Sequence, residues 1–352
     1  MTPTARKTQS GSVLMLTMWT IVLLSMLVLV MASEVRLSAE LSKSQIDRTD
    51  NWADTLTALN AAEMELLLET MPPPAEDVDP EDDDDIKNPD FRFNGQPLDL
   101  IYDYPETMEV RIYDHAGKIN LRNLTEDKLR LLLENMMEEV DDDEIEELLA
   151  AWGDWIDEDD GVRNEGAEDD YYLSLDPPYL PRQGQLESVE ELLLIRGFEK
   201  YFADVNLGAA FTLYSEGELV NLNTASREAL ALLPGLDSTA IDAILTYRNE
   251  QDFTDLVDLE DIVSQEDLVE LQNWIDFTSV SQTYTVLVVP RQLLGKTTDG
   301  EDGDEEAADP AGLQERKQPK FGGFSKIIRV PDYNERPVIL RVDPMPRLPD
   351  LE

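Results

Sequence analysis

The residues best suited to chemistry are the carboxylates of DWIDEDDGVRNEGAEDDYY, residues 154–172. Calcium prefers carboxylate and carbonyl oxygens from a short flexible loop. Asp157 and Asp159 alternate along the chain, and Glu168 takes the twelfth position counted from Asp157, as in an EF-hand loop. An EF-hand has glycine at position six, where this chain has Val162, so a regular EF-hand is not expected. Two alternatives remain: an irregular loop that calcium stabilises, or a solvated acidic loop.

A second candidate site is the segment 220–259, in which Leu-Pro-Gly-Leu at 233–236 separates two predicted helices. It resembles a helix-hairpin-helix unit of the competence-protein type, whose hairpin amides and basic residues bind a DNA phosphate. Residues 221–263 carry two basic residues, Arg227 and Arg248, against nine acidic ones, a net charge of −7. Phosphate binding depends on counterion release by lysine and arginine, so DNA binding is disfavoured. We expect this unit to pack within the protein or to contact another protein.

Few other groups could support enzymatic catalysis. The chain has no cysteine, which excludes thiolate metal sites and thiol nucleophiles. Its one histidine, His115, lies in YDHAGK, a pattern typical of a turn between strands, and no partner nucleophile is evident. A membrane-tethered enzyme would therefore be limited to metal–carboxylate chemistry, and we predict a non-enzymatic protein.

The overall charge of the chain argues against nucleic-acid binding. The chain has 76 acidic and 28 basic residues among 352, a formal net charge of −48. Such a surface repels phosphate backbones, so nucleic acid is not an expected partner. Divalent cations, basic protein surfaces or a high-salt environment suit it better.

The N-terminal region contains a predicted membrane span. Residues 13–32 carry no charge. A helix of this length, at roughly 1.5 Å per residue, crosses the ~30 Å hydrocarbon core, whereas a secretory signal has an apolar region of about 7–15 residues. Arg6 and Lys7 precede the span and acidic residues follow it. The positive-inside rule therefore predicts a single-pass anchor with a cytoplasmic N-terminus and the bulk of the chain across the membrane.

The helical pattern continues beyond the span. Residues 34–70 contain no glycine or proline, and MPPP at 71–74 is expected to end the helix. One helix over 12–70 is therefore predicted, with a transmembrane helix followed by a separate linker helix as the alternative.

The remaining chain alternates between strand and helix patterns and predicts an α+β protein with an inserted helical domain. MEVRIYDHAGKINL, residues 108–121, is expected to form a β-hairpin. The expected regions are an acidic linker with the first strands (71–119), a helical domain (120–278), and C-terminal strands (279–352) that include an acidic loop (295–323).

A weak internal repeat runs through the helical region. INLRNLTEDKLRLLL at 119–133 aligns with VNLNTASREALALLP at 220–234. Each copy has Asn-Leu at the end of a predicted strand and then a hydroxyl residue, Thr125 or Ser226, as a candidate helix N-cap. The asparagines, Asn120 and Asn221, are expected to bind local backbone groups.

Taken in order, these segments resemble the GspK family, the large minor pseudopilins of type II secretion systems. The resemblance rests on the basic leader ending in Gly11, the apolar helix, and the segments IYDHAGKINLRNL, WGDWIDEDD, GAEDDYY, ESVEELLLIRGF and VNLNTASREALALLPGL. It implies a pilin-like fold, with a long N-terminal transmembrane helix and a small antiparallel sheet. The inserted all-α domain would contain helix-hairpin-helix or SAM-like repeats.

The resemblance also assigns roles to N-terminal residues. Residues 1–11 would be a leader that a prepilin peptidase removes after Gly11, leaving Ser12 as a methylated N-terminus. Most pilins carry glutamate at the fifth mature position, where this chain has Leu16. Without that carboxylate the subunit need not pair with a subunit above it, and the bulky inserted domain would clash inside a helical stack. Both features favour the tip of a filament.

The remaining implications concern metal and partners. The resemblance implies structural calcium near GAED, with Asp157, Asp159, Glu168 and Asp169 as candidate ligands and Asp170 as a weaker one. It implies assembly with the I- and J-type minor pseudopilins, the major pseudopilin and prepilin peptidase, in the bacterial inner membrane with the bulk of the chain periplasmic. The alternative is a membrane-anchored helix-hairpin-helix DNA receptor of the competence type.

Overall fold

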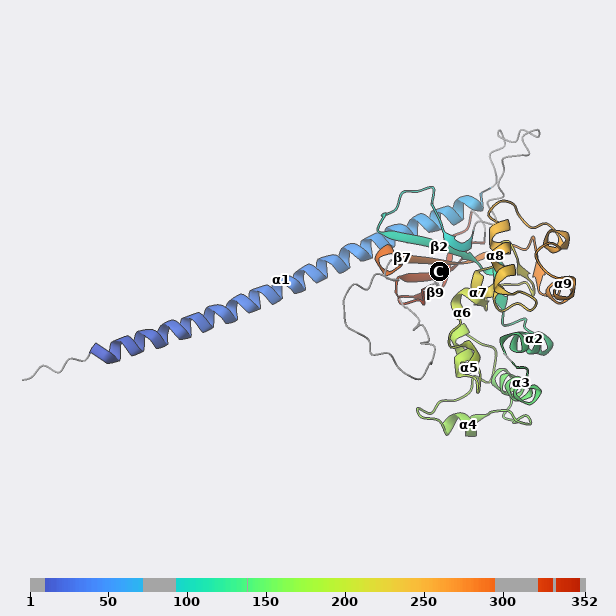
Figure 1. The fold of residues 1–352 in the computed structure, drawn as a ribbon, viewed down its shortest axis with the longest axis horizontal. Helices are drawn as coiled ribbons and strands as arrows, with labels where there is room; N and C mark the ends of the chain where they lie inside the picture. Colours follow the sequence, from blue (N-terminus) through green and yellow to red (C-terminus); the bar gives the residue numbers. More distant parts are fainter. Residues whose placement is uncertain (1–9, 72–92, 138, 295–321, 332–333, 349–352) are drawn as a thin grey trace, which may run out of the picture. The chain divides into compact units, whose positions relative to one another are not determined.

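The computed structural model describes residues 10–71, 93–137, 139–294, 322–331 and 334–348 (Figure 1). Most of the predicted acidic linker and of the acidic loop 295–323 lies outside the described residues. The chain forms two compact units, Met1–Asp54 and Thr55–Glu352. The α+β class, with an N-terminal apolar helix and an antiparallel sheet, is confirmed.

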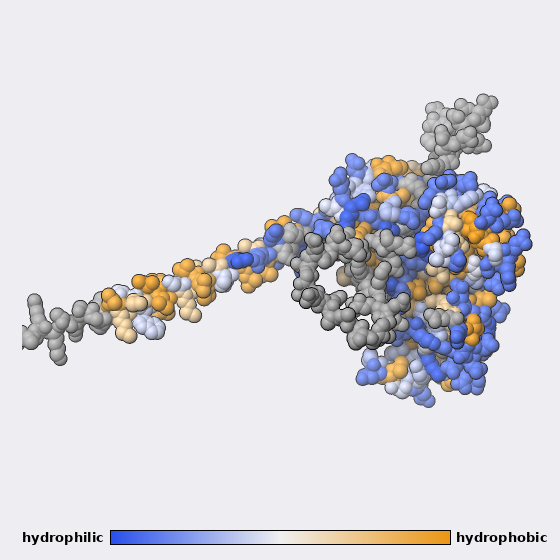
Figure 2. Space-filling model, viewed as in Figure 1, coloured by the Kyte–Doolittle hydropathy of each residue, from blue (hydrophilic) through white to orange (hydrophobic). Residues whose placement is uncertain are grey.

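Helix α1 is continuous over Ser10–Glu69, 60 residues, and ends before the proline run. Within the described residues it is the one helix long and apolar enough to cross a membrane. Leu14 to Met31 expose their apolar side chains, which Figure 2 shows as a mainly orange stretch of this helix. A helix of that composition requires an apolar surrounding along this stretch.

The sheet of the second unit has five antiparallel strands in the order β1-β2-β7-β8-β9. The two central neighbours, β2 and β7, are far apart in sequence, and Met108 pairs with Pro290 while Asp114 pairs with Tyr284. The chain therefore leaves the sheet after β2, forms the helical region, and returns to the sheet as the adjacent strand β7. The strands are β1 (Asn94–Pro97), β2 (Met108–Asp114), β7 (Thr283–Pro290), β8 (Phe324–Arg329) and β9 (Val338–Asp343).

The last turns of α1 cover one face of this sheet. Ala58, Ala62 and Leu66 recur at helical spacing, are at most 1% exposed, and pack on Val110 of β2 and Val286 of β7. The small alanines permit close approach of helix and sheet, and Leu66 fills the space beyond them. Figure 1 shows this end of α1 lying along the sheet.

We expect Leu66→Ala to destabilise the protein by about 2–5 kcal/mol, because it removes a fully packed side chain and leaves a cavity. Leu56→Ala is the matched control, since Leu56 lies on the same helix and is 41% exposed. Urea unfolding of the full-length protein in detergent micelles measures both. Equal effects of the two substitutions would contradict the packing described above.

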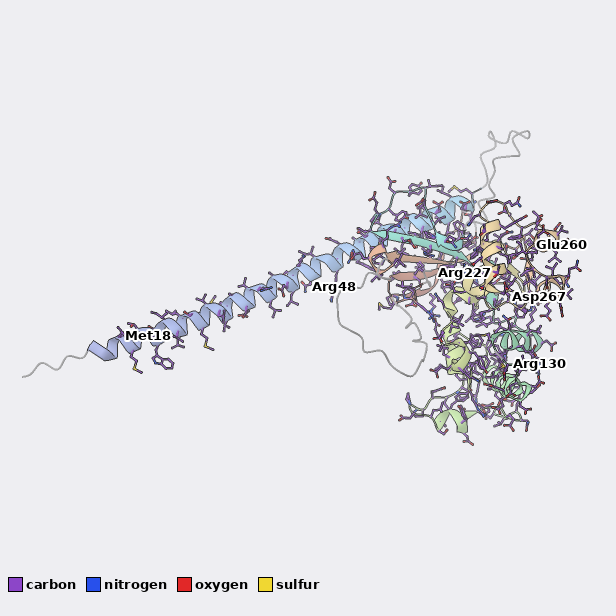
Figure 3. All side chains as sticks on the ribbon, viewed as in Figure 1. Met18, Arg48, Arg130, Arg227, Glu260 and Asp267 are labelled. Atoms are coloured by element: carbon purple, nitrogen blue, oxygen red, sulfur yellow. The ribbon has the colours of Figure 1, made fainter. Side chains whose placement is uncertain are left out.

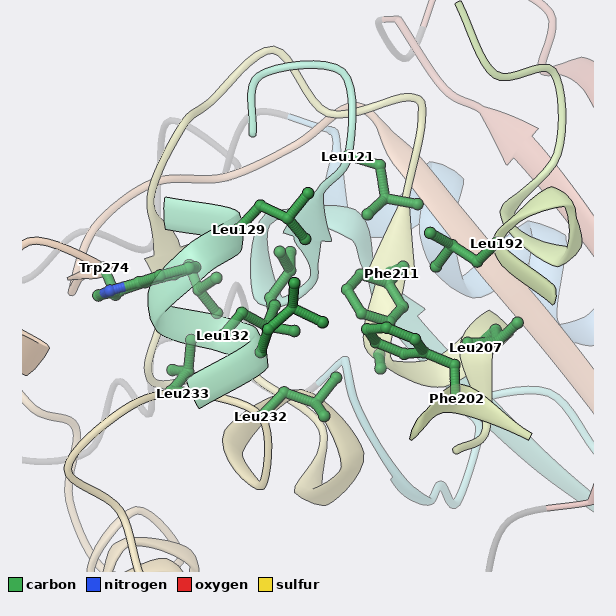
Figure 4. Packing of buried hydrophobic residues seen from close by; sticks show 14 of the residues in the cluster. Leu121, Leu129, Leu132, Leu192, Phe202, Leu207, Phe211, Leu232, Leu233 and Trp274 are labelled. Atoms are coloured by element: carbon green, nitrogen blue, oxygen red, sulfur yellow. The ribbon is translucent and has the colours of Figure 1, made fainter. Parts of the chain in front are cut away.

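The helical region between β2 and β7 has a separate core (Figure 4). Leu129 and Leu132 point into it from α2, towards Phe202 and Phe211, whose rings meet edge to face with centroids 5.9 Å apart. Two small parallel sheets, β3-β4 and β5-β6, border this core. The elements are β3 (Ile119–Asn120), α2 (Glu126–Met136), α3 (Asp142–Ile156), α4 (Asp169–Leu173), η3 (Val189–Leu194), α5 (Glu199–Phe202), α6 (Leu207–Ala210), β4 (Phe211–Thr212), β5 (Val220–Asn221), α7 (Arg227–Leu230), α8 (Ser238–Tyr247), η4 (Leu256–Leu259), α9 (Gln265–Leu271) and β6 (Ile275–Asp276), followed by α10 (Arg291–Leu294) after β7.

The predicted β-hairpin at residues 108–121 is wrong. Strand β2 pairs with β1 and β7, whereas β3 pairs in parallel with β4 of the helical region. Between them the short helix η2 (His115–Gly117) is capped by Asp114, whose carboxylate accepts from the Ala116 amide. A β-carbon at Gly117 would lie 2.3 Å from the Thr224 carbonyl oxygen, so the chain passes too close to that segment for any larger residue.

The internal repeat has matching local structure. Thr125 caps α2 by accepting from the Lys128 amide, and Ser226 caps α7 by accepting from the Ala229 amide, as predicted. Asn120 donates to the Ser215 carbonyl, and Asn221 donates to the Ser279 carbonyl. Each asparagine also accepts from the amide two residues ahead, so both serve the backbone at a strand-to-helix switch.

Candidate functional site

The acidic loop links the end of α3 to the short α4. Asp154, in the last turn of α3, is 0% exposed, and its carboxylate accepts from the Arg163 amide. A β-carbon at Gly166 would lie 2.0 Å from Oδ2 of Asp154, so the GAED segment needs its glycine to pass this carboxylate. The loop is thus folded around a buried acidic group.

A single arginine offsets part of this charge. Nη1 of Arg163 lies 3.1 Å from Oδ1 of Asp154 and 2.7 Å from Oδ2 of Asp157. Half of the Arg163 side chain remains exposed, so it approaches the carboxylates from the solvent side. One guanidinium therefore serves two carboxylates and leaves net negative charge inside the loop.

Glu168 is the least satisfied carboxylate of the loop. It is 5% exposed, and both of its carboxylate oxygens are buried without a hydrogen-bond partner. Burial raises the pKa of Glu168, and the charges of Asp154, Asp157 and Asp169 raise it further. One carboxylate oxygen of Asp157, Oδ1, is also buried without a partner. Unpaired buried oxygens of this kind are costly unless a cation or proton meets them.

The candidate ligands are only partly brought together. Asp157, Glu168 and Asp169 interact electrostatically, whereas Oδ1 of Asp159, an exposed residue, accepts from the Gly161 amide. The sequence pattern does not single out Asp154, although an acid in the last turn of a helix opposes the helix dipole and is an informative signal. Across the described residues no three acidic groups are placed to hold a metal. A calcium ion here would also need backbone carbonyls or water, which are ordinary calcium ligands.

The donor chemistry nevertheless fits a hard divalent cation. The three partnerless oxygens, two on Glu168 and one on Asp157, are the ligand type that calcium selects. Asp154 adds a third carboxylate within electrostatic reach of Glu168. Cation binding would relieve the repulsion that now raises the pKa of Glu168.

Aromatic residues and one arginine hold the loop in place. The Trp155 and Tyr172 rings meet edge to face with centroids 5.2 Å apart. The Arg196 guanidinium donates to the carbonyls of Glu165 and Gly166 and lies over the Tyr171 ring. The loop backbone is therefore fixed on the α3 side and on the side that follows η3.

Among the residues that the structure describes, the hairpin between α7 and α8 offers no free cation. Arg227 pairs with Asp242 of α8, and Arg248 is 9% exposed and donates to the Leu222 and Ala225 carbonyls. Acidic residues such as Glu260 and Asp267 lie at the outer edge of this region, where Figure 3 labels them. Both basic residues that could contact a phosphate are thus engaged inside the protein.

A cavity of about 400 Å³ lies between the sheet and the helical region. His115 lies in its wall, 1% exposed, and its Nδ1 and Nε2 are 2.6 Å from Thr212 Oγ1 and 2.8 Å from Thr285 Oγ1. Burial lowers the pKa of His115 well below its ordinary value, so the imidazole is neutral. The position in a turn is as predicted, and the bridging role is new.

Lys118 lies in the same wall. It is 2% exposed, and its ammonium donates to the Gly208 carbonyl and to Thr285 Oγ1. Burial lowers the pKa of Lys118 to about 7, although the charges of Glu228 and Asp114 act in the opposite direction. A cation in this position is held mainly by neutral groups.

We expect Lys118→Met to raise the free energy of unfolding at pH 6, by on the order of 2 kcal/mol, because it removes a buried charge. The gain should shrink as pH rises from about 7 towards 10.5, since there the unfolded wild-type chain binds the Lys118 proton and the folded one does not. Urea unfolding at several pH values measures this. Lys200 is a surface lysine whose pKa is raised by its hydrogen bond to Glu144, and it serves as the control. The difference in the free energy of unfolding between Lys200→Met and wild type should stay constant between pH 6 and 9. A constant difference for Lys118→Met would contradict the prediction.

The fold and the acidic loop together define a class: an α+β protein with one apolar N-terminal helix and an antiparallel sheet, interrupted by a large helical region. Residues 117–204 match the family model of type II secretion system (T2SS) protein K. The match begins at η2 and includes the acidic loop.

The chain is similar to the type II secretion system protein K of Aeromonas hydrophila, with 37% identity over 128 residues, 35% of this chain and 38% of that one. For the Klebsiella pneumoniae protein of that name, identity is 36% over 90 residues, 26% of this chain and 28% of that one. The chain thus spans about a third of the length of the curated relatives it matches.

A crystal structure of the GspK-GspI-GspJ complex from the enterotoxigenic Escherichia coli type 2 secretion system contains a chain of similar fold. The TM-score is 0.50 at 15% identity, and the alignment covers 86% of this chain and 98% of that one. The family-model and sequence matches confirm the resemblance to the GspK family found in the sequence, and the structural match shows a similar fold.

Proposed function

We propose that this chain is a minor pseudopilin of a type II secretion system, the tip subunit that initiates and caps the periplasmic pseudopilus. The observation that carries this proposal is the match of residues 117–204 to the T2SS protein K model, in a chain with a long apolar N-terminal helix. The mechanism is assembly: apolar helices pack together in the membrane and are then drawn into a filament. The large helical region occupies the tip because it has no room inside a stack.

The proposed partners are minor pseudopilins of the I and J types. Support comes from the similar fold of a chain in a GspK-GspI-GspJ complex. The contact surface would include the apolar stretch of α1, whose exposed side chains need apolar neighbours. The major pseudopilin would follow below this complex, and prepilin peptidase would act before assembly.

The proposed location is the bacterial inner membrane, crossed once by residues 13–32. Arg6 and Lys7 support a cytoplasmic N-terminus. Cleavage after Gly11 would leave Ser12 as a methylated N-terminus. Leu16, an exposed apolar residue of α1, then takes the fifth position and brings no carboxylate that must pair with a subunit above.

The helix-hairpin-helix assignment of α7 and α8, and of SAM-like repeats in general, stays a proposal. The paired Arg227 and buried Arg248 support a role in packing or protein contact. Because both arginines are engaged within the protein, the alternative, a competence-type DNA receptor, would have no cation at the hairpin to bind a phosphate. A non-enzymatic role agrees with a neutral, buried His115 that serves structure.

Structural calcium is the proposed ligand of the acidic loop. Glu168 and Asp157 would supply the main oxygens, with Asp154 and Asp169 nearby. Asp159 and Asp170 are the weaker candidates, because both are exposed. The ion would stabilise the loop between α3 and α4, and no catalytic step depends on it.

Co-purification tests the proposed function. The full-length chain is co-expressed with I- and J-type minor pseudopilins and prepilin peptidase, extracted in detergent, and isolated through a tag on one partner. We expect all three chains to elute together, with calcium or with a chelator as parallel arms. Failure to recover either minor pseudopilin with the tagged chain would overturn the assignment.

A further inference from the structure

The cavity between the sheet and the helical region has the size of a ligand site. Its volume of about 400 Å³ falls within the roughly 300–1,000 Å³ typical of small-molecule pockets. Strands β7, β8 and β9 form one side of it, and η3 and α6 form the other. Its lining is mainly apolar with a few polar groups, as in most ligand pockets. It lies apart from the acidic loop, whose carboxylates do not line it.

Lys118 is the unusual group in this wall. An ammonium has three N–H donors, and here two are used, at 2.6 Å to the Gly208 carbonyl and 3.0 Å to Thr285 Oγ1. The Tyr113 ring centroid lies 5.1 Å from Nζ. In the part of the chain that the structure describes, Lys118 forms no ion pair with a carboxylate. The carboxylates of Glu228 and Asp114 act on Lys118 through space without forming an ion pair with it. A buried ammonium with one open donor can therefore still attract an anion.

We propose that this cavity binds a small monocarboxylate with an apolar body, and that its carboxylate is held by the Lys118 ammonium. This proposal is independent of the proposed function of the chain. The carboxylate would accept the free donor of Lys118 and neutralise a charge that now has only neutral contacts. In a chain of net charge −48, this buried lysine gives an anion a local site that the outer surface does not.

The rest of the lining defines what is attached to the carboxylate. Leu193, Val205, Leu213, Leu287 and Ile327 line the cavity and suit an aliphatic or aromatic body. These five side chains offer no hydrogen-bond partner, so the part of the ligand that contacts them should be apolar.

Two acidic residues of the lining restrict the net charge of the ligand. Glu190 accepts from Arg341 of β9 at 2.9 Å, so this arginine is already neutralised, and Asp343 adds a second carboxylate to the lining. A dianion would meet these carboxylates once Lys118 had taken its first charge. The other arginine of the lining, Arg347, already donates to the carbonyls of Ala203, Asp204 and Val205. The lining therefore favours a monoanion over a dicarboxylate or phosphate.

Phenylacetate is a suitable probe, and phenylacetamide is its neutral isostere. Both are titrated by calorimetry into the full-length protein in lipid nanodiscs, with empty nanodiscs as the blank. The titration is run at pH 6, below the Lys118 pKa of about 7. We expect the acid to bind at least tenfold more tightly than the amide, and inorganic phosphate to give no saturable signal. This comparison uses the unaltered protein, so it does not depend on the folding of any variant.

Substitutions locate the bound probe. Lys118→Met should weaken phenylacetate binding at least tenfold and leave the weak binding of the amide unchanged. Lys128→Met removes the same charge from helix α2, away from the cavity lining, and should leave both unchanged. Equal affinity for acid and amide, absence of saturable phenylacetate binding, or undiminished binding to a folded Lys118→Met protein would each overturn the proposal.

Discussion

Calcium is expected to stabilise the full-length protein, and Glu168→Gln is expected to abolish that effect. Glu168 buries two carboxylate oxygens without a partner, and Asp157 buries one. An ion that binds only the folded state at 100 times its dissociation constant adds about 2.7 kcal/mol. Thermal unfolding in detergent micelles, with calcium or a chelator, measures the gain. Tryptophan fluorescence is a suitable signal because Trp155 packs on Tyr172 beside the loop.

Glu168→Gln should change the stability of the protein in opposite directions with and without calcium. In chelator the variant should be more stable than wild type, because it removes a buried charge whose pKa is raised by burial and by neighbouring acids. In calcium the wild type should be the more stable protein. Glu165→Gln, an exposed residue of the same loop, is the matched control and should keep the full calcium response. A wild-type protein whose thermal stability does not respond to calcium would contradict the proposed calcium site.

A second large effect is expected on removal of the leader when Gly11 is substituted. In cells with prepilin peptidase, the wild-type protein should begin at Ser12, and Gly11→Val should leave it beginning at Met1. Arg6 and Lys7 precede the bond that is expected to be cleaved. Moving such a charge to the bilayer centre costs about 2.5–3.5 kcal/mol, so a subunit that keeps the leader resists extraction from the membrane.

N-terminal sequencing of protein purified from membranes measures this, with peptidase-deficient cells as the reference. The uncleaved variant should stay in the membrane fraction and be missing from sheared pseudopili. Ser10→Ala, one residue earlier, is the matched control and should be processed normally. Wild-type protein that retains Met1 in peptidase-positive cells would refute the pseudopilin assignment.

Local sequence patterns predicted local structure well. The proline run after residue 70 marks the end of a helix that spans Ser10–Glu69, and the hydroxyl residues Thr125 and Ser226 cap the helices that follow them. The hairpin prediction failed because alternation shows that a segment is extended and not which strand it pairs with. Strand β2 pairs with β1 and with β7, and β7 lies more than 160 residues away, so this second pairing depends on the whole helical region.

The sequence predicted which kinds of residues form the candidate site, but not how they are arranged in space. Glu168 and Asp157 stood out by their spacing, and both carry unpartnered oxygens. Asp154 belongs to an amphipathic helix pattern, and only its burial against Arg163 reveals its part in the loop. Lys118 ends the predicted turn YDHAGK, and its burial against the Gly208 carbonyl and Thr285 Oγ1 depends on residues 90 and 167 positions away.

The bridge at His115 has a mechanical consequence. One imidazole joins Thr285 of β7 to Thr212 of β4, so the sheet and the helical region share a crosslink beside the point where the chain passes between them. Force applied to the sheet along the strands would load this crosslink directly, with no flexible tether in between. Because the ring is neutral and shielded from water, the joint keeps its stiffness across the physiological pH range.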